Sequence, residues 1–524
     1  MVFSIRYKKK NRKSGASAFH TGYGMRYAVC GSRGLPAPRL RQAGVTVILV
    51  LIFMGIFAML TGSIAGYVFE QGKYGRALSA REQAIHISEA GIEYYRWFLA
   101  HNPSVLQNGT GLVSPYTYQV NDPEGGNLGN ATITATPNLQ CGISQWIDIV
   151  SVGTANSAPM FPRTLLVRHM RPSVAEYSNM LNSNVWAGAD RNITGPYFSN
   201  GGIRMDGTNN SDVSSAVSTW SCDSSFGCSP TQSKPGVWGA GSGSALWQFP
   251  LSSFDFSGIA TNFSALKTYA QTGGIVLNPT SVLVGGVQQG GTFSSVGGND
   301  QQGFHLVFNA NGTVSVYRVT GTSLARGLRG DTFTWGNDYN TITSETLKGT
   351  YTVPSGCSLI YSEAKTWIEG TILGKVTLVA ADTGSYAPDI ILQGNINYVS
   401  SGGTSGLSAI AERSVLIPLV APNIMTVRGI FIAQTGYLGR NHYTTSGSNE
   451  VPSQYDSYVK RSTLTTNGTV VSNGRVGTKW SCGGSYCSGY NTRVDNYDRL
   501  LAFGPPSFTP AASPDYTFVV WKEQ

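Results

Sequence analysis

Charged side chains are scarce in this chain, because Asp, Glu, Lys and Arg together make up 12% of its 524 residues. Typical globular domains carry about twice that share. Glycine, by contrast, occurs 64 times, and serine, threonine and asparagine are abundant. This composition disfavours helical bundles and acidic disordered segments. It favours strands and turns that carry an uncharged surface.

Motifs of the common nucleotide-binding and hydrolytic enzymes are absent. The chain has no Walker loop, no dinucleotide-binding glycine fingerprint and no Gly-x-Ser-x-Gly nucleophile elbow. Its six histidines are scattered without metal-ligand spacing. We therefore expect no enzyme, no catalytic residue, no cofactor and no metal centre. Glycan cleavage is left open for four carboxylates, although the sequence sets no distance between them: Glu363, Glu369, Asp382 and Asp389.

Acidic residues are missing from the first 44 positions, which hold ten of the 37 Lys and Arg residues. The rest of the chain has 27 basic and 28 acidic residues, so it has no excess of positive charge with which to bind phosphates. We therefore exclude nucleic acid as a partner. The basic segment directly precedes an apolar run, which predicts a cytoplasmic N-terminus and an extracytoplasmic remainder.

The apolar run extends from Val45 to Phe69 without a charged residue. It is about 25 residues long, roughly 37 Å as a helix, which is enough to cross a ~30 Å hydrocarbon core with some tilt. A secretory signal peptide would have a shorter apolar core and a small-residue cleavage site. The run is too long for that class and merges into further helix, so we predict a transmembrane helix.

The helical pattern continues over residues 70–101. Small and apolar residues recur at three- and four-residue spacing between charged ones, as in an amphipathic helix. Asn102-Pro103 ends the pattern, because the residue before a proline disfavours helical angles. The face expected to pack against a sheet consists of Ala84, Ile87, Gly91, Tyr95 and Phe98.

Six of the seven cysteines follow the apolar run, in a compartment where disulfides persist. Short spacing predicts two local disulfides, Cys222 with Cys228 and Cys482 with Cys487, which leaves Cys141 to pair with Cys357. Zinc is the alternative for these cysteines. It is disfavoured because neither close pair has two-residue spacing and no histidine lies nearby in the sequence.

The remaining sequence predicts strands, with one sequence pattern in residues 111–172 and another from Val185 onward. Within residues 111–172, four runs of alternating residues predict a small antiparallel sheet that covers the amphipathic helix. From Val185 onward, short apolar runs broken by glycine or asparagine favour a β-solenoid. We find no clean numerical repeat, so a β-sandwich or jelly roll stays open. A helix is expected at 254–270, and a hairpin is expected to turn at Asn311-Gly312.

The predicted fold class is therefore mainly β with one long N-terminal α-helix. Its expected divisions are a basic cytoplasmic leader (1–44), a transmembrane helix (45–69), its amphipathic continuation (70–101), an antiparallel sheet (102–172), a solenoid-like domain (173–207 and 361–524) and an inserted strand-rich subdomain (208–360).

One loop has oxygen ligands at alternating positions. The stretch from Asp206 to Asp212 (DGTNNSD) could bind calcium through these oxygens. It lacks the distal glutamate and the glycine position of an EF-hand loop, so a hydrogen-bonded turn is the simpler interpretation.

Arg39-Leu-Arg-Gln-Ala-Gly44, followed by the apolar run, resembles the type IV prepilin signal, in which a membrane peptidase cuts after the glycine. The Ile87-Ser-Glu-Ala-Gly-Ile92 stretch is similar to that of PilX-type minor pilins and pseudopilin-like assembly proteins. The resemblance implies cleavage between Gly44 and Val45, a helix followed by a small antiparallel sheet, and a prokaryotic cell envelope. Major pilins carry a glutamate where this chain has Leu49, which argues against a bulk filament subunit.

Two functions fit these patterns. The leading one is a minor pilin or pilin-like cell-surface protein in filament assembly or adhesion. Its partners would be the membrane, other pilin-like subunits, the pilus assembly machinery and a surface glycan or protein ligand. The alternative is a permanently anchored extracytoplasmic β-helix protein that binds or cleaves polysaccharide.

Overall fold

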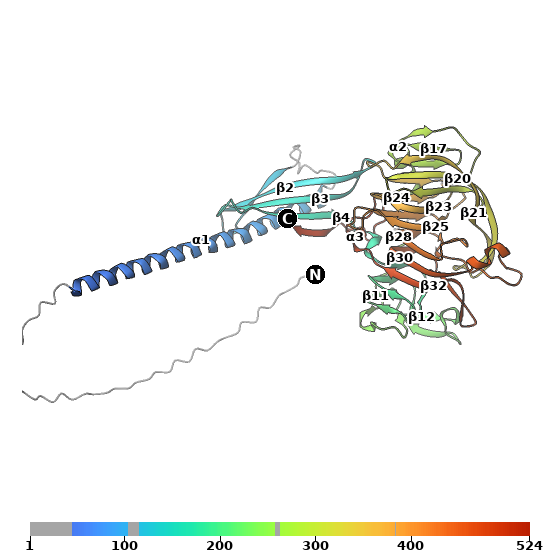
Figure 1. The fold of residues 1–524 in the computed structure, drawn as a ribbon, viewed down its shortest axis with the longest axis horizontal. Helices are drawn as coiled ribbons and strands as arrows, with labels where there is room; N and C mark the ends of the chain where they lie inside the picture. Colours follow the sequence, from blue (N-terminus) through green and yellow to red (C-terminus); the bar gives the residue numbers. More distant parts are fainter. Residues whose placement is uncertain (1–44, 103–114, 257–261, 383) are drawn as a thin grey trace, which may run out of the picture. The chain divides into compact units, whose positions relative to one another are not determined.

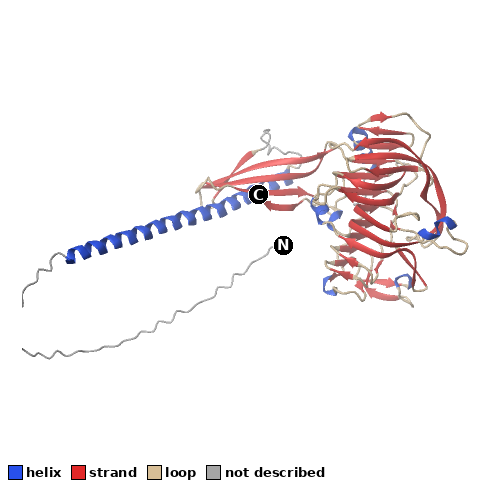
Figure 2. Ribbon diagram, in the orientation of Figure 1, coloured by secondary structure: helices blue, strands red, loops and turns tan. Residues whose placement is uncertain are grey.

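The computed structural model describes residues 45–102, 115–256, 262–382 and 384–524. Two units divide the chain between Gly75 and Arg76. A single long helix, α1 (Val45–His101), is followed by many strands and short helices (Figures 1 and 2). The predicted fold class, mainly β with one long N-terminal helix, is confirmed.

The helix α1 ends where the sequence predicts. The Asn102 backbone N–H donates to the Phe98 carbonyl at 2.9 Å, and the Asn102 amide donates to the same oxygen at 3.3 Å. These bonds satisfy a carbonyl that the last helical turn leaves without an intrahelical partner.

A five-stranded antiparallel sheet follows, in the order β1-β2-β3-β4-β33. Its strands are β1 (Tyr116–Asn121), β2 (Asn127–Gln140), β3 (Ile143–Ala155), β4 (Arg163–Met170) and β33 (Thr517–Glu523). The fifth strand differs from the sequence-based division, which placed residues 517–523 in the solenoid. β33 pairs with β4, with Phe518 opposite His169, and Glu523 forms an ion pair with Arg163. The C-terminus of the chain thus completes the first sheet.

The large β region is built from parallel strands that stack rung on rung, as in a solenoid. Its longest row consists of β16 (Ile275–Asn278), β22 (Leu359–Ser362), β24 (Lys375–Ala380), β26 (Gly406–Ala411), β28 (Ile424–Ala433), β30 (Lys460–Ser472), β5 (Asn179–Leu181), β8 (Tyr197–Ser199), β11 (Val213–Ser215) and β15 (Trp247–Gln248). A second parallel row contains β19 (Gly303–Phe308), β23 (Lys365–Ile372), β25 (Ile390–Tyr398), β27 (Val415–Leu416) and β29 (Leu438–Gly439). Parallel pairing between successive rungs distinguishes this architecture from an antiparallel sandwich.

The solenoid core is a stack of apolar side chains from equivalent positions. Ile360, Leu378, Ala409, Phe431 and Val470 occupy the same register position on five successive strands, and all are buried. Each rung buries its apolar face against the next, so the stack needs no local sequence repeat beyond the alternation of inward and outward residues.

The order of the strands in the solenoid differs from their order in the sequence. The C-terminal half of β30 pairs with β5, so the blocks 173–207 and 361–524 adjoin one another. An asparagine ladder crosses this seam: Asn200 donates to Asn182, and Asn182 donates to Asn473, both at 2.7 Å. In Figure 1 the blue-green strands therefore lie beside the orange-red ones.

Residues 208–360 do not form the separate inserted subdomain that the sequence analysis expected. β11 and β15 extend the longest row at one end, and β16 joins that row through β22. The antiparallel strands β20 (Thr313–Leu328) and β21 (Trp335–Thr352), named here the hairpin arm, leave the rungs. The expected helix at 254–270 is α2 (Phe263–Gly273) instead, because the Asn262 side chain caps it by accepting from the Ala265 N–H.

Candidate functional site

The first part of α1 presents an apolar surface that the rest of the described chain does not cover. Every side chain from Val45 to Phe69 is exposed. By length and composition α1 could cross a membrane. Val45 begins the helix, whereas the predicted cleavage partner Gly44 lies outside the described residues. This surface fits lipid tails or the apolar surfaces of other helices.

The later part of α1 packs on the five-stranded sheet. Four residues of the expected face lie in one core with the sheet's side chains: Ala84, Ile87, Tyr95 and Phe98. The Ser88 hydroxyl on the same face donates to the Ser151 carbonyl of β3 at 2.7 Å. A polar group buried at this contact is thereby satisfied.

Two glycines set the close approach of the helix to the sheet. A Cβ on Gly91 would lie 2.6 Å from the Ala131 Cβ, and a Cβ on Gly153 would lie 2.0 Å from the Ala84 carbonyl oxygen. Neither position has room for a side chain. Gly91, the fifth residue of the expected face, therefore allows the helix to pack closely on the sheet because it has no side chain.

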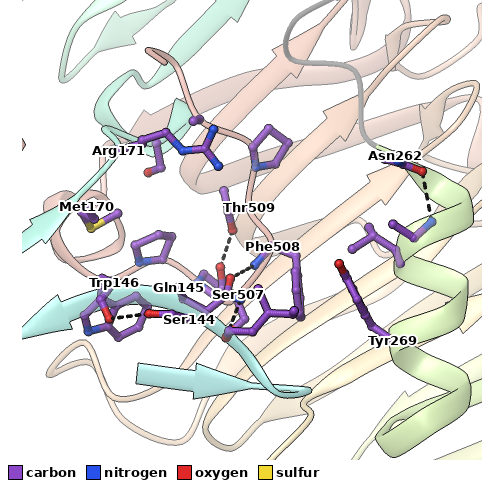
Figure 3. Close-up of a pocket in the computed structure, with 18 of the residues that line it drawn as sticks. Ser144, Gln145, Trp146, Met170, Arg171, Asn262, Tyr269, Ser507, Phe508 and Thr509 are labelled. Atoms are coloured by element: carbon purple, nitrogen blue, oxygen red, sulfur yellow. Dashed lines mark hydrogen bonds between the residues drawn. The ribbon is translucent and has the colours of Figure 1, made fainter. Parts of the chain in front are cut away.

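A cleft lies beside the start of β3, next to this sheet (Figure 3). It has a volume of about 470 Å³. Its walls come from β3, the segment after β4, α2 and the C-terminal segment 505–511, which carry among others Trp146, Arg171, Tyr269 and Phe508. Sequence segments far apart in the chain meet here, so the cleft marks the junction between the sheet and the solenoid.

Several bonds fasten this junction. The Phe508 N–H donates to the Gln145 side-chain oxygen at 2.8 Å, and the Phe508 ring stacks on Tyr269 (Figure 3). The disulfide Cys141–Cys357 joins the β2–β3 turn to the solenoid. The junction is thus cross-linked both covalently and by hydrogen bonds.

Cationic side chains at the junction surround one tryptophan. Arg168 of β4 binds both Asp148 oxygens, at 2.7 and 2.9 Å, and donates to the Phe503 carbonyl at 2.8 Å. Its guanidinium lies 4.6 Å from the Trp146 ring, and the Lys375 ammonium lies 5.6 Å from it. Burial, together with the Arg168 charge, lowers the pKa of Lys375 to about 8. These contacts connect the sheet to the segment that carries Phe503 and to β24.

Among the described residues there are three disulfides with the pairing expected from sequence: Cys141–Cys357, Cys222–Cys228 and Cys482–Cys487. Within the described ranges, one group of side chains is close enough to hold a metal ion, namely His442, Cys482 and Cys487. Its two cysteines are joined to each other, so neither offers a thiolate.

The aspartates of the suggested calcium loop lie in different environments. Asp206 accepts hydrogen bonds from the Trp186 indole, the Arg204 guanidinium and the Ala240 N–H, at 2.8, 2.8 and 3.0 Å. Asp212 is exposed. Protein donors therefore satisfy the Asp206 carboxylate, and calcium binding here stays a prediction.

The four carboxylates considered for glycan cleavage have protein neighbours. Glu363 pairs with Lys267, Glu369 with His305 and Asp389 with Arg413, at 3.1, 3.3 and 2.6 Å. Asp382 accepts from the Gly384 N–H at 3.2 Å. Three of the four are thus engaged in ion pairs.

Sequence reasoning missed a polar network beneath the hairpin arm. The buried Lys365 ammonium donates to the carbonyls of Asp300 and Tyr339, at 3.1 and 3.3 Å. Arg413 joins the carboxylates of Asp300 and Asp389, both at 2.6 Å. These residues line a cavity of about 40 Å³. No sequence spacing signals this network, because rung stacking and the arm bring its members together.

Comparison with known proteins gives little beyond this geometry. No protein-family model matches the chain, and no curated protein matches it. Among solved structures, the competence-associated pilin ComZ from Thermus thermophilus is 11% identical, with a TM-score of 0.32 over 85% of this chain and 97% of that one.

Proposed function

We propose that this chain is a membrane-anchored, type IV pilin-like cell-surface protein of the PilX-type minor class, acting in filament assembly or adhesion. The proposal rests on the two different surfaces of the helix α1. Its apolar first part is uncovered, and its second part packs on a small antiparallel sheet. One element thereby offers a surface for lipid or neighbouring helices and a fixed attachment for the β region.

In this proposal the solenoid is the displayed module. The Cys141–Cys357 disulfide and the Arg168 contacts attach it firmly to the helix-bearing sheet. The N-terminus would be cytoplasmic, because ten positive charges precede the apolar run. Leu49, at the fifth position of the processed chain, suits a subunit present in few copies.

The test is mass spectrometry of the native protein, followed by shearing of the cells. We expect the mature chain to begin at Val45 and to occur in the sheared filament fraction. A Gly44→Val variant should keep its leader. A wild-type chain that retains residues upstream of Gly44 would overturn the prepilin part of the proposal.

A permanent envelope anchor is the second candidate, and the same uncovered apolar helix supports it. It predicts that the protein stays in the membrane fraction after shearing and is absent from filaments. The fractionation therefore separates the two functions.

A further inference from the structure

Two grooves meet on one side of the solenoid, away from the junction cleft. One, of about 540 Å³, is lined by His442, Thr444, Lys460 and the Cys482–Cys487 disulfide, among others. The other, of about 430 Å³, is lined by Arg326, Glu450, Ser453 and neighbouring residues. They share Thr445 and Asp456. The two grooves are therefore neighbours, and together they are named here the lateral groove.

An aromatic platform lies beside the lateral groove, where His442 of the groove lining contacts two tryptophans that are not themselves part of that lining. The His442 ring contacts the rings of both Trp335 and Trp480, with centroid separations of 5.6 and 5.5 Å. Phe333, 46% exposed, lies 6.0 Å from Trp480. His442, Trp335 and Trp480 are half-buried. Their rings are therefore held in place, and part of each is exposed to solvent.

The platform is held by the backbone around it. The Trp480 indole donates to the Arg440 carbonyl at 2.8 Å, and His442 exchanges two backbone hydrogen bonds with Leu328 of β20. Burial, aided by the Arg440 charge, lowers the pKa of His442, which favours a neutral imidazole at this position. The His442, Trp335 and Trp480 rings are thus held in place, and the Arg475 guanidinium lies 5.1 Å from the Phe333 ring beside them.

Charges in the lateral groove are balanced. It contains the cations Arg326 and Lys460 and the anions Glu450 and Asp456. Arg326 is also held by Asn337 and Asn449, at 2.8 and 3.3 Å. A balanced lining selects neither a polyanion nor a polycation. The hydroxyls of Thr444, Thr445, Ser453 and Ser457 also line the groove.

We propose that the lateral groove binds a segment of an uncharged polysaccharide. A sugar ring has an apolar C–H face, which suits an aromatic platform, and a rim of hydroxyls, which suits carboxylate, hydroxyl and ammonium partners. One end of the segment lies on Trp335 and His442, and its hydroxyls bond to Asp456 and Thr445. This binding site goes beyond the proposed function and does not depend on whether α1 enters a filament.

The test uses the full chain in detergent micelles. Isothermal calorimetry and tryptophan fluorescence follow binding of four soluble neutral probes, an α-glucan, a β-glucan, a mannan and N-acetylglucosamine oligomers. We expect at least one probe to bind. Trp335→Ala and Asp456→Asn should each weaken that binding at least ten-fold. The matched controls Trp97→Ala and Asp515→Asn, at exposed positions outside the lateral groove, should leave it unchanged.

Several results would overturn the proposal. One is no binding to any of the four probes by a wild-type chain with an intact circular-dichroism spectrum. Another is binding that both groove variants retain in full. A third is salt-dependent binding of a single-stranded DNA oligonucleotide in place of the neutral probes, which would assign the groove to a polyanion. Melting curves of Asp456→Asn separate lost binding from lost folding.

Discussion

Gly91 fixes the distance between α1 and its sheet, because any side chain there meets Ala131 and Ser151. We expect Gly91→Ala to destabilise the protein by about 1–3 kcal/mol, the usual cost of overpacking, despite the higher helix propensity of alanine. Thermal unfolding of the full chain in detergent, followed by circular dichroism, measures this change. Gly72→Ala is the matched control, since a Cβ there would meet no atom within 4 Å apart from the neighbouring backbone of its own helix. Equal melting of both variants would contradict the close-packing argument.

His305 makes the attachment of the hairpin arm sensitive to pH. Its Nδ1 lies 2.9 Å from Glu345 of the arm, and its Nε2 lies 3.3 Å from Glu369 of β23. Burial lowers the pKa of His305, but the two carboxylates outweigh burial and raise it above 6.5. Because the folded-state pKa is raised, the protonated ring stabilises the fold below pH 6.5. This contribution is lost as the pH rises through the raised pKa.

We therefore expect the melting temperature of the wild type to fall more steeply than that of Glu345→Gln as the pH rises above 6.5. His305→Gln should remove this part of the slope. His86→Gln, at an exposed position of α1, is the control and should keep the wild-type slope. Parallel curves for the wild type and Glu345→Gln would show that the ion pair does not contribute.

At the scale of elements, the Cys141–Cys357 disulfide closes 216 residues of chain between the sheet and the solenoid. Long closed loops restrict the unfolded state most. We expect Cys141→Ser with Cys357→Ser to destabilise the protein by about 2–4 kcal/mol in denaturant unfolding. Cys222→Ser with Cys228→Ser, which opens a separation of 6 residues, should cost less. The reverse order would contradict the loop-length argument.

The elements that could be predicted are those whose residue pattern is contained in one continuous stretch of sequence. The bounds of α1 follow from the uncharged run, the three- and four-residue spacing and Asn102-Pro103. Strands β2 and β3 extend beyond their alternating cores, because the ladder between them continues from Gly129 to Gln140. Their existence could be predicted, but their ends are set by pairing.

Elements that depend on distant partners were not predictable. The run Thr517–Glu523 has the composition of a strand, yet nothing in it identifies β4 as its neighbour. Likewise, the stacking order of the solenoid strands, which places β30 beside β5, decides which residues from distant parts of the sequence lie close together. The residues of the polar network beneath the hairpin arm and of the lateral groove could therefore be identified only from the three-dimensional stacking of the strands.

At the scale of the whole molecule, exposed apolar surface is concentrated at the start of α1. All residues from 45 to 69 are exposed, and the unit from Arg76 onward contains the sheet and the solenoid with their cores. We expect a chain that begins at Arg76 to be monodisperse without detergent, whereas the chain from Val45 requires it. Size-exclusion chromatography with light scattering measures this difference. The shorter chain should also keep the melting temperature of the longer one and its binding of neutral glycan. If it instead aggregates while folded, apolar surface outside the anchor helix must be exposed, and the division between a lipid-facing helix and a water-facing β region would be wrong.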